Sequence, residues 1–118
     1  FGIVGSLYAQ KYLNVAQPKV GLLNIGTEDS KGTDLQKQAY ALLTDAAQQG
    51  ILNFVGNVEA REVFSGDMNI VVTDAFAGNV LLKNTEGVVS FIFKALQVFS
   101  KIILQSLYTS VILASRMG

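Results

Sequence analysis

Three short apolar runs, each stopped by a glycine or an aspartate, most constrain how this 118-residue chain can fold. The runs are residues 20–25, 51–55 and 70–73. Short uninterrupted apolar runs are typical of buried strands in a parallel sheet. After the first run, apolar residues recur at helical spacing from residue 35 to 47, with Thr33 or Asp34 as N-cap and Gly50 as the stop. This alternation predicts an α/β fold with right-handed βαβ crossovers.

The two ends of the chain differ from this central pattern. Residues 2–13 carry apolar side chains near helical spacing and predict a helix that ends before Pro18. Residues 88–118 are mostly apolar, with a narrow polar stripe that includes Lys94 and Lys101. We expect a pair of helices there, the second beginning near residue 107. Because two lysines disfavour a membrane-spanning helix, packing on a partner or on a lipid surface is the preferred interpretation.

Composition restricts the chemistry that the chain can perform. The sequence has no cysteine and no histidine, which excludes disulfides, thiolate zinc sites and imidazole acid–base catalysis. The net charge is zero, and no basic stripe interleaved with aromatic residues suggests nucleic-acid binding. We therefore expect neither a metal nor a nucleic-acid partner. The absence of cysteine is compatible with the cytoplasm, and Phe1 suggests that the chain begins inside a longer protein.

The loop after the first apolar run is a candidate anion site, since ligands bind at the carboxyl ends of parallel strands. Asn24 stands near the end of this run, and Gly26 and Gly32 flank a loop that contains Lys31. Glycines let backbone amides approach a ligand, and the following helix N-terminus favours negative charge. Glu28 and its neighbouring aspartate oppose an anion, so an ordinary solvated turn with a surface lysine remains the alternative.

The loops after the other two runs supply further candidates. Asp74 directly follows the third run, and Asn79 lies where we expect the next helix to start. Capping is the structural alternative for both, Asn79 as an N-cap and Asp74 as a carboxylate that caps the same turn. Asn57 and Glu59 follow Gly56 and are secondary candidates with a stronger structural alternative.

Three segments together resemble the PlsX-type phosphate acyltransferases, in the same order and at similar separations. They are residues 18–28, 53–59 and 71–80, and residues 5–9 match as well. The resemblance implies a partial doubly wound three-layer αβα sandwich with parallel strands, related to the isocitrate and isopropylmalate dehydrogenase architecture. It also implies a homodimer and the reaction of an acyl-acyl-carrier-protein thioester with inorganic phosphate. Two departures stand out: Ala75 replaces the glycine usual in that turn, and family members are much longer.

Carried over by position, the resemblance makes Lys31 and Asn79 the leading substrate-site residues, with Asp74 and Asn24 beside them. The loops after the three runs supply the remaining candidates. The catalytic candidates are Lys31, Asn79 and Asp74. The substrate-binding candidates are Asn24, Gly26, Gly32, Asn57 and Gly78. No cofactor is implied. Residues 1–87 would form the catalytic segment, and residues 88–118 the apolar helix pair that contacts a second subunit or a membrane.

The resemblance further implies a cellular setting. The partners would be acyl-acyl-carrier protein, inorganic phosphate, a second copy of the chain and a downstream glycerol-3-phosphate acyltransferase. The protein would be cytoplasmic, with peripheral contact at the inner face of the membrane. Two rival functions stay open: an inactive module that mediates dimer or membrane contact, and a phosphotransacetylase that acts on coenzyme A thioesters.

Overall fold

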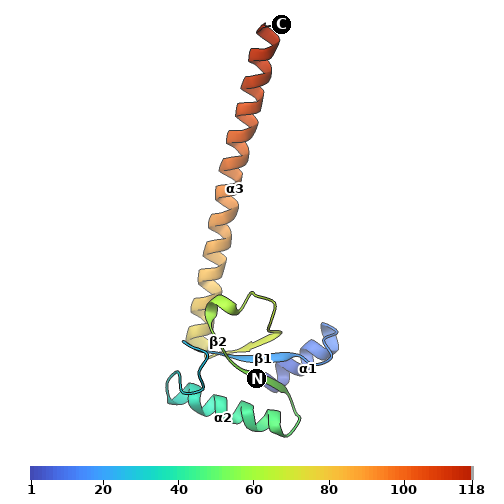
Figure 1. Cartoon of the computed structure of the whole chain (residues 1–118), viewed down its shortest axis with the longest axis vertical. Helices are drawn as coiled ribbons and strands as arrows, with labels where there is room; N and C mark the ends of the chain where they lie inside the picture. The colour runs from blue at the N-terminus through green and yellow to red at the C-terminus, as the bar shows by residue number, and fades with distance from the viewer. Residues whose placement is uncertain (118) are drawn as a thin grey trace. The chain divides into compact units, whose positions relative to one another are not determined.

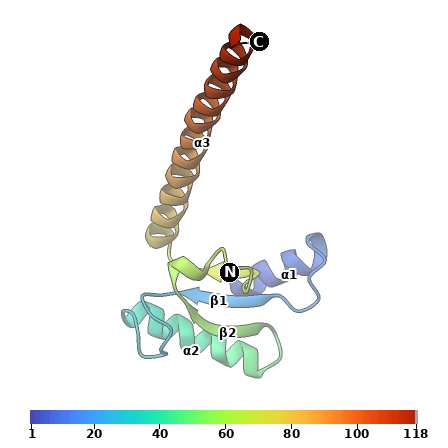
Figure 2. The same ribbon diagram turned by 45° about the horizontal axis from the view of Figure 1, so that its top comes forward.

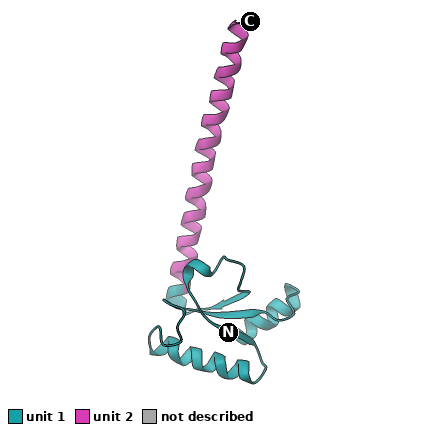
Figure 3. Ribbon diagram, in the orientation of Figure 1, with its two compact units in different colours: residues 1–77 teal, residues 78–118 magenta. Residues whose placement is uncertain are grey.

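The computed structural model describes residues 1–117, and its elements follow the alternation that the sequence predicts (Figure 1). In chain order they are α1 (Gly2–Tyr12), β1 (Lys19–Leu23), α2 (Asp34–Gln48), β2 (Asn53–Val58), the 3-10 helix η1 (Ala60–Glu62), β3 (Ile70–Val72) and α3 (Ala75–Met117). By internal contacts the chain divides into two compact units, residues 1–77 and residues from Gly78 onward (Figure 3). Our predicted division after residue 87 falls inside α3, downstream of this boundary.

The first unit is built on a three-stranded parallel sheet with the order β2-β1-β3. The central strand β1 pairs Val20 with Ile70 of β3 and with Phe54 of β2. Partners in register point to the same face, so these three side chains share one face of the sheet. Val20 is fully buried there, which makes β1 the centre of a small core.

Helices α1 and α2 both pack against this face. A Cβ at Gly2 of α1 would lie 3.0 Å from Leu43 of α2 and 3.5 Å from Val72 of β3. Tyr40 of α2 meets Phe54 of β2 edge to face, with ring centroids 5.1 Å apart. Figure 2 shows α2 running beneath β1 and β2. In the first unit these two helices therefore form a single layer, and the predicted three-layer dehydrogenase-like architecture stays a prediction.

The opposite face of the sheet meets the segment that leads from β2 to β3. A Cβ at Gly21 of β1 would lie 3.0 Å from Val58 and 3.1 Å from the sulfur of Met68 in that segment. Val58 is 1% exposed, so part of this face is also buried from solvent. The glycine allows Met68 to approach the centre of the sheet closely, which a larger residue would prevent.

Strand β2 differs from its predicted bounds. We expected residues 51–55 with an end at Gly56, but the strand runs on to Val58. The register with β1 shifts between Val20 and Gly21, where Val20 pairs with Phe54 and Gly21 with Gly56, leaving Val55 as an extra residue. Gly56 has φ 103°, a left-handed conformation suited to glycine at a bulge. The glycine thus bends the strand without ending it, and Asn57 lies within β2 rather than in a loop.

Helix α3 is a single helix of 43 residues, so the predicted helix pair is wrong. Residues 88–117 contain no glycine or proline to break it. The hydroxyls of Thr109 and Ser110 donate to the carbonyls of Gln105 and Ser106, four residues earlier, so these polar groups are satisfied within the helix.

Most of the apolar side chains of α3 are exposed within the described chain. An 18-residue window of the helix has mean hydropathy 1.7 and none of it is buried. By length and composition alone the helix could therefore span a membrane, although Lys94 and Lys101 disfavour this.

Candidate functional site

The carboxyl ends of the three strands meet at one edge of the sheet because all three are parallel. Asn24 follows β1, Asn57 is the next-to-last residue of β2, and Asp74 follows β3. The loop of residues 24–33 leads from this edge to the first turn of α2, and Lys31 lies within it. The fold therefore brings four of the predicted site residues to the same edge, as the topology predicts.

Asn24 closes the loop that contains Lys31. Its backbone N–H donates to the carbonyl of Val58 at 2.9 Å, which ties the end of β1 to the end of β2. Its side-chain Oδ1 accepts from the N–H of Ile25 at 2.8 Å, and its Nδ2 donates to the carbonyl of Lys31 at 3.0 Å. The side chain thus holds the beginning and the end of the loop together.

The two glycines of this loop are required by close packing. Gly32 has φ 91°, and a Cβ there would lie 2.8 Å from Asn24 Oδ1 and 2.8 Å from Cβ of Gln36. A Cβ at Gly26 would lie 2.9 Å from a carboxylate oxygen of Glu28 and 3.0 Å from Cγ of Lys31. The stem of Lys31 therefore lies across Gly26, and the glycine leaves room for it.

Lys31 presents an exposed ammonium at the edge of the sheet. Within residues 1–117 the ion pairs are Arg61–Glu59 and Lys83–Glu86, so Lys31 has no carboxylate within 4.0 Å. Its backbone N–H donates to the carbonyl of Glu28 at 3.1 Å and closes a short turn. Glu28 lies nearby but makes no direct ion pair with Lys31, so the exposed ammonium can be approached by an anion.

Asn57 holds the same turn from the neighbouring strand. It is 8% exposed, and its Nδ2 donates to the carbonyl of Glu28 at 2.8 Å. Its Oδ1 is buried and has no hydrogen-bond partner among the described residues. Most buried polar atoms in proteins are paired, so this oxygen requires an explanation.

Asp74 caps the first turn of α3. Its Oδ1 accepts from the N–H of Ala77 at 2.7 Å, and its Oδ2 accepts from Nε2 of Gln36 at 3.4 Å. The capping interpretation of Asp74 is therefore confirmed, and its part in catalysis stays a prediction.

Asn79 is not an N-cap, because α3 begins at Ala75 and Asn79 lies inside the first turns of the helix. Its side chain is exposed, whereas Gly78 before it is buried. Both residues belong to the second compact unit. Their contribution to the site stays a prediction.

Gln36 was missed by the sequence reasoning, although its signal was present. Its Oε1 accepts from the backbone N–H and the hydroxyl of Thr33, forming a capping box at the start of α2. The Thr33-x-x-Gln36 spacing is the sequence signature of this motif. Through its Nε2, Gln36 also joins α2 to Asp74.

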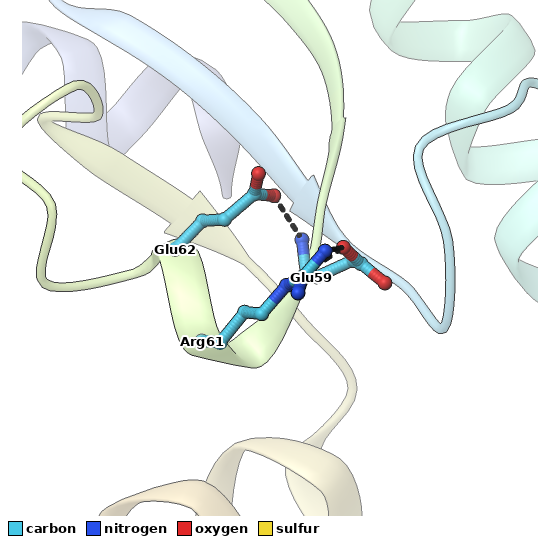
Figure 4. A network of polar contacts seen from close by, with 3 residues as sticks. All are labelled: Glu59, Arg61 and Glu62. Atoms are coloured by element: carbon cyan, nitrogen blue, oxygen red, sulfur yellow. Dashed lines mark hydrogen bonds and ion pairs between the residues drawn. The ribbon is translucent and has the colours of Figure 1, made fainter.

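Glu59 forms a local network at η1 (Figure 4). Its Oε2 lies 2.9 Å from Nη2 of the exposed Arg61, and its backbone N–H donates to Oε2 of Glu62 at 3.0 Å. Glu59 and Glu62 form a capping box around η1. This carboxylate therefore has a structural role, in agreement with the alternative that the sequence left open.

A hollow of about 410 Å³ lies away from this edge, beside the beginning of β2. It is lined by Ser6, Gln10, Ala16, Gln17, Pro18, Gly50, Ile51, Leu52 and Asn53. None of these side chains carries a charge, so the hollow lacks groups that would neutralise an anion. Within residues 1–117 there is also no cluster of three or more potential metal ligands.

The first unit is thus a parallel α/β fold with a glycine-framed lysine loop at the carboxyl ends of its strands, the edge at which such folds bind ligands. Residues 1–117 match the family described as fatty acid synthesis protein, and the chain belongs to this family. This match, together with relatives named phosphate acyltransferase, confirms the resemblance at the level of the family.

Relatives from several bacteria carry the name phosphate acyltransferase. The relative from Oceanobacillus iheyensis is 52% identical over 97 residues, which cover 82% of this chain and 28% of the relative. The relative from Clostridium tetani is 50% identical with the same coverage. The relative from Halothermothrix orenii is 48% identical over 108 residues, covering 91% of this chain and 32% of the relative. The chain thus spans less than a third of the length of these relatives.

Proposed function

We propose that this chain is part of an acyltransferase of lipid synthesis that converts acyl-acyl-carrier protein and inorganic phosphate to acyl phosphate. Membership of the fatty acid synthesis family and relatives named phosphate acyltransferase support the reaction class. The observation that carries the proposal is the unpaired Lys31 on a glycine-framed loop at the carboxyl edge of the sheet. A lysine in this setting suits a phosphate substrate.

The proposed reaction needs no nucleophile from the protein. An oxygen of phosphate attacks the thioester carbonyl carbon, the C–O bond forms, and the C–S bond breaks. The electron pair leaves with sulfur, which takes up a proton to give the thiol of the carrier's pantetheine arm. The protein holds phosphate in line with the thioester and stabilises the tetrahedral oxyanion. This suits a chain without cysteine or histidine.

Each candidate residue has a task in this proposal. Lys31 and the amides of its loop neutralise phosphate, and the side-chain amide of Asn79 donates to phosphate or to the oxyanion. Asp74 orients the start of α3 through its bond to Ala77 and links it to α2 through Gln36. No metal or organic cofactor takes part in the proposed steps.

The exposed apolar surface of α3 supports the proposed partners. We expect it to contact a second copy of the chain or the cytoplasmic face of the membrane. A peripheral position would let the acyl phosphate pass directly to a membrane glycerol-3-phosphate acyltransferase.

The test is an initial-rate assay of thiol release by the full-length gene product, with acyl-acyl-carrier protein or acyl-coenzyme A as donor. The proposal expects release that requires phosphate and is faster with the carrier protein. Faster reaction with coenzyme A thioesters would instead identify a phosphotransacetylase. No phosphate-dependent release from either donor would leave the inactive module as the better interpretation.

A further inference from the structure

We infer that Asn57 is a positioning residue for the phosphate site: it holds the Glu28–Lys31 turn, and through this turn it sets where the Lys31 ammonium stands. The inference rests on the proposed function. It concerns a residue that acts through the loop and does not itself touch the phosphate.

A single carbonyl oxygen joins Asn57 to Lys31. The carbonyl of Glu28 accepts from Asn57 Nδ2 at 2.8 Å and from the backbone N–H of Lys31 at 3.1 Å. The first bond comes from strand β2 and the second from inside the turn. Asn57 therefore ties the rigid sheet to the backbone unit from which the lysine side chain extends.

The loop has few other ties to the sheet. Within residues 1–117, the side chains that hydrogen-bond to its carbonyls are Asn24, which holds Lys31, and Asn57, which holds Glu28. Residues 27–31, which include the turn, are all exposed. Without the Asn57 bond, the carbonyl of Glu28 would keep only the hydrogen bond from the N–H of Lys31, which lies inside the turn and does not connect it to the sheet.

The unpaired oxygen of Asn57 indicates that a contribution to stability does not by itself account for an asparagine at this position. Its Oδ1 is buried without a partner, and a buried acceptor left unpaired destabilises the fold. An apolar residue of similar size would avoid this cost at a position that is 8% exposed. The benefit of the amide therefore lies in its donor, which reaches Glu28.

A displaced turn should weaken phosphate binding more than thioester binding. Lys31 interacts with phosphate both before and during the reaction, so its misplacement acts as a loss of uniform binding. The expected signature is a higher KM for phosphate, with a smaller change in kcat and an unchanged KM for the acyl donor. A purely structural role would instead lower the stability and the amount of active enzyme, leaving both KM values in place.

The experiment compares Asn57→Leu with a matched control in the full-length gene product. Asn53→Leu changes the same residue type in the same strand at its other end, where the side chain is exposed. For Asn57→Leu we expect the phosphate KM to rise by about tenfold or more, the scale of one hydrogen bond lost at a binding site. We expect its Tm to stay at or above that of the parent, and Asn53→Leu to leave the phosphate KM unchanged.

The Lys31→Ala variant separates the two possible failures. If Lys31→Ala raises the phosphate KM but Asn57→Leu leaves it at the value of Asn53→Leu, the positioning role is overturned and the proposed function stands. If Lys31→Ala also leaves the phosphate KM unchanged, the proposed site itself is wrong.

Should Asn57→Leu fail to fold, Asn57→Ser replaces it, since the shorter hydroxyl also withdraws the donor from Glu28. The same rise in phosphate KM is expected, and an unchanged KM overturns the role.

Discussion

Lys31 and Asn79 are exposed polar residues, which separates their proposed role from folding. We predict that Lys31→Ala and Asn79→Ala each lower kcat/KM for phosphate by about a hundredfold or more, Lys31→Ala through weaker phosphate binding and Asn79→Ala through loss of an oxyanion-type donor. The unfolding free energy should change little, since neither side chain is in the core. Steady-state kinetics and urea denaturation check both parts. Lys37→Ala, an exposed lysine on α2, serves as the control, and losses below about tenfold for both variants would remove support for the site.

Gly32 should be hard to replace for two separate reasons. Its φ of 91° is unfavourable for any other residue by about 1–2 kcal/mol, and a Cβ there would also collide with Asn24 and Gln36. We predict that Gly32→Ala lowers the unfolding free energy by more than Gly66→Ala in urea denaturation. Gly66 has φ 90° but open space around it, so its substitution measures the backbone strain alone. Equal losses in the two variants would show that the loop does not pack as tightly as the structure has it.

At the scale of elements, Asp74 joins the starts of two helices. Asp74→Ala removes the acceptor for the N–H of Ala77 and should lower the unfolding free energy by about 1 kcal/mol, the usual effect of losing an N-cap. Asp74→Asn keeps an acceptor oxygen at the same place and should recover most of this loss. Thermal or urea denaturation of the two variants makes the comparison. A loss of the same size in Asp74→Asn would mean that the charge, rather than the cap, stabilises the helix start.

The sequence predicted the order of elements well because each carries its own local signal. The helical spacing before Gly50 and the runs ended by Gly26 and Asp74 indicate elements that the structure confirms. The end of β2 could not be predicted, since Gly56 normally signals a stop and only pairing with β1 shows that it forms a bulge. The continuity of α3 was missed, because we expected a second helix to begin near residue 107, although residues 88–117 contain no glycine or proline that would end the first.

The candidate site was predictable in position but not in detail. Parallel strands bring Asn24, Asn57 and Asp74 to one edge, so the sequence pattern was enough to group them. The bond from Asn57 to the carbonyl of Glu28 involves a backbone oxygen, which exists in every residue and leaves no trace in the sequence. Gln36 was the exception, since its spacing from Thr33 is a recognisable capping signal.

At the scale of the whole molecule, the apolar surface of α3 is the feature that the first unit does not explain. Phe93 and Phe99 are 63% and 62% exposed within the described chain. We predict that changing both to serine in the full-length protein weakens dimer formation or binding to anionic liposomes, because each change removes a large apolar contact. Sedimentation and liposome flotation provide the readouts, with Gln97→Ser and Gln105→Ser as a control pair on the same helix. Parent-like behaviour in both assays would assign these phenylalanines to an intramolecular core.

The most direct test of the central claim follows the oxygen atoms of the reaction. The full-length gene product is incubated with acyl-acyl-carrier protein and phosphate labelled with ¹⁸O, and the product is analysed by ³¹P NMR and mass spectrometry. Attack by phosphate on the thioester carbonyl predicts acyl phosphate that retains every labelled oxygen and forms in step with released thiol. Thiol released without phosphate, or a free fatty acid formed in place of acyl phosphate, would contradict the proposed reaction.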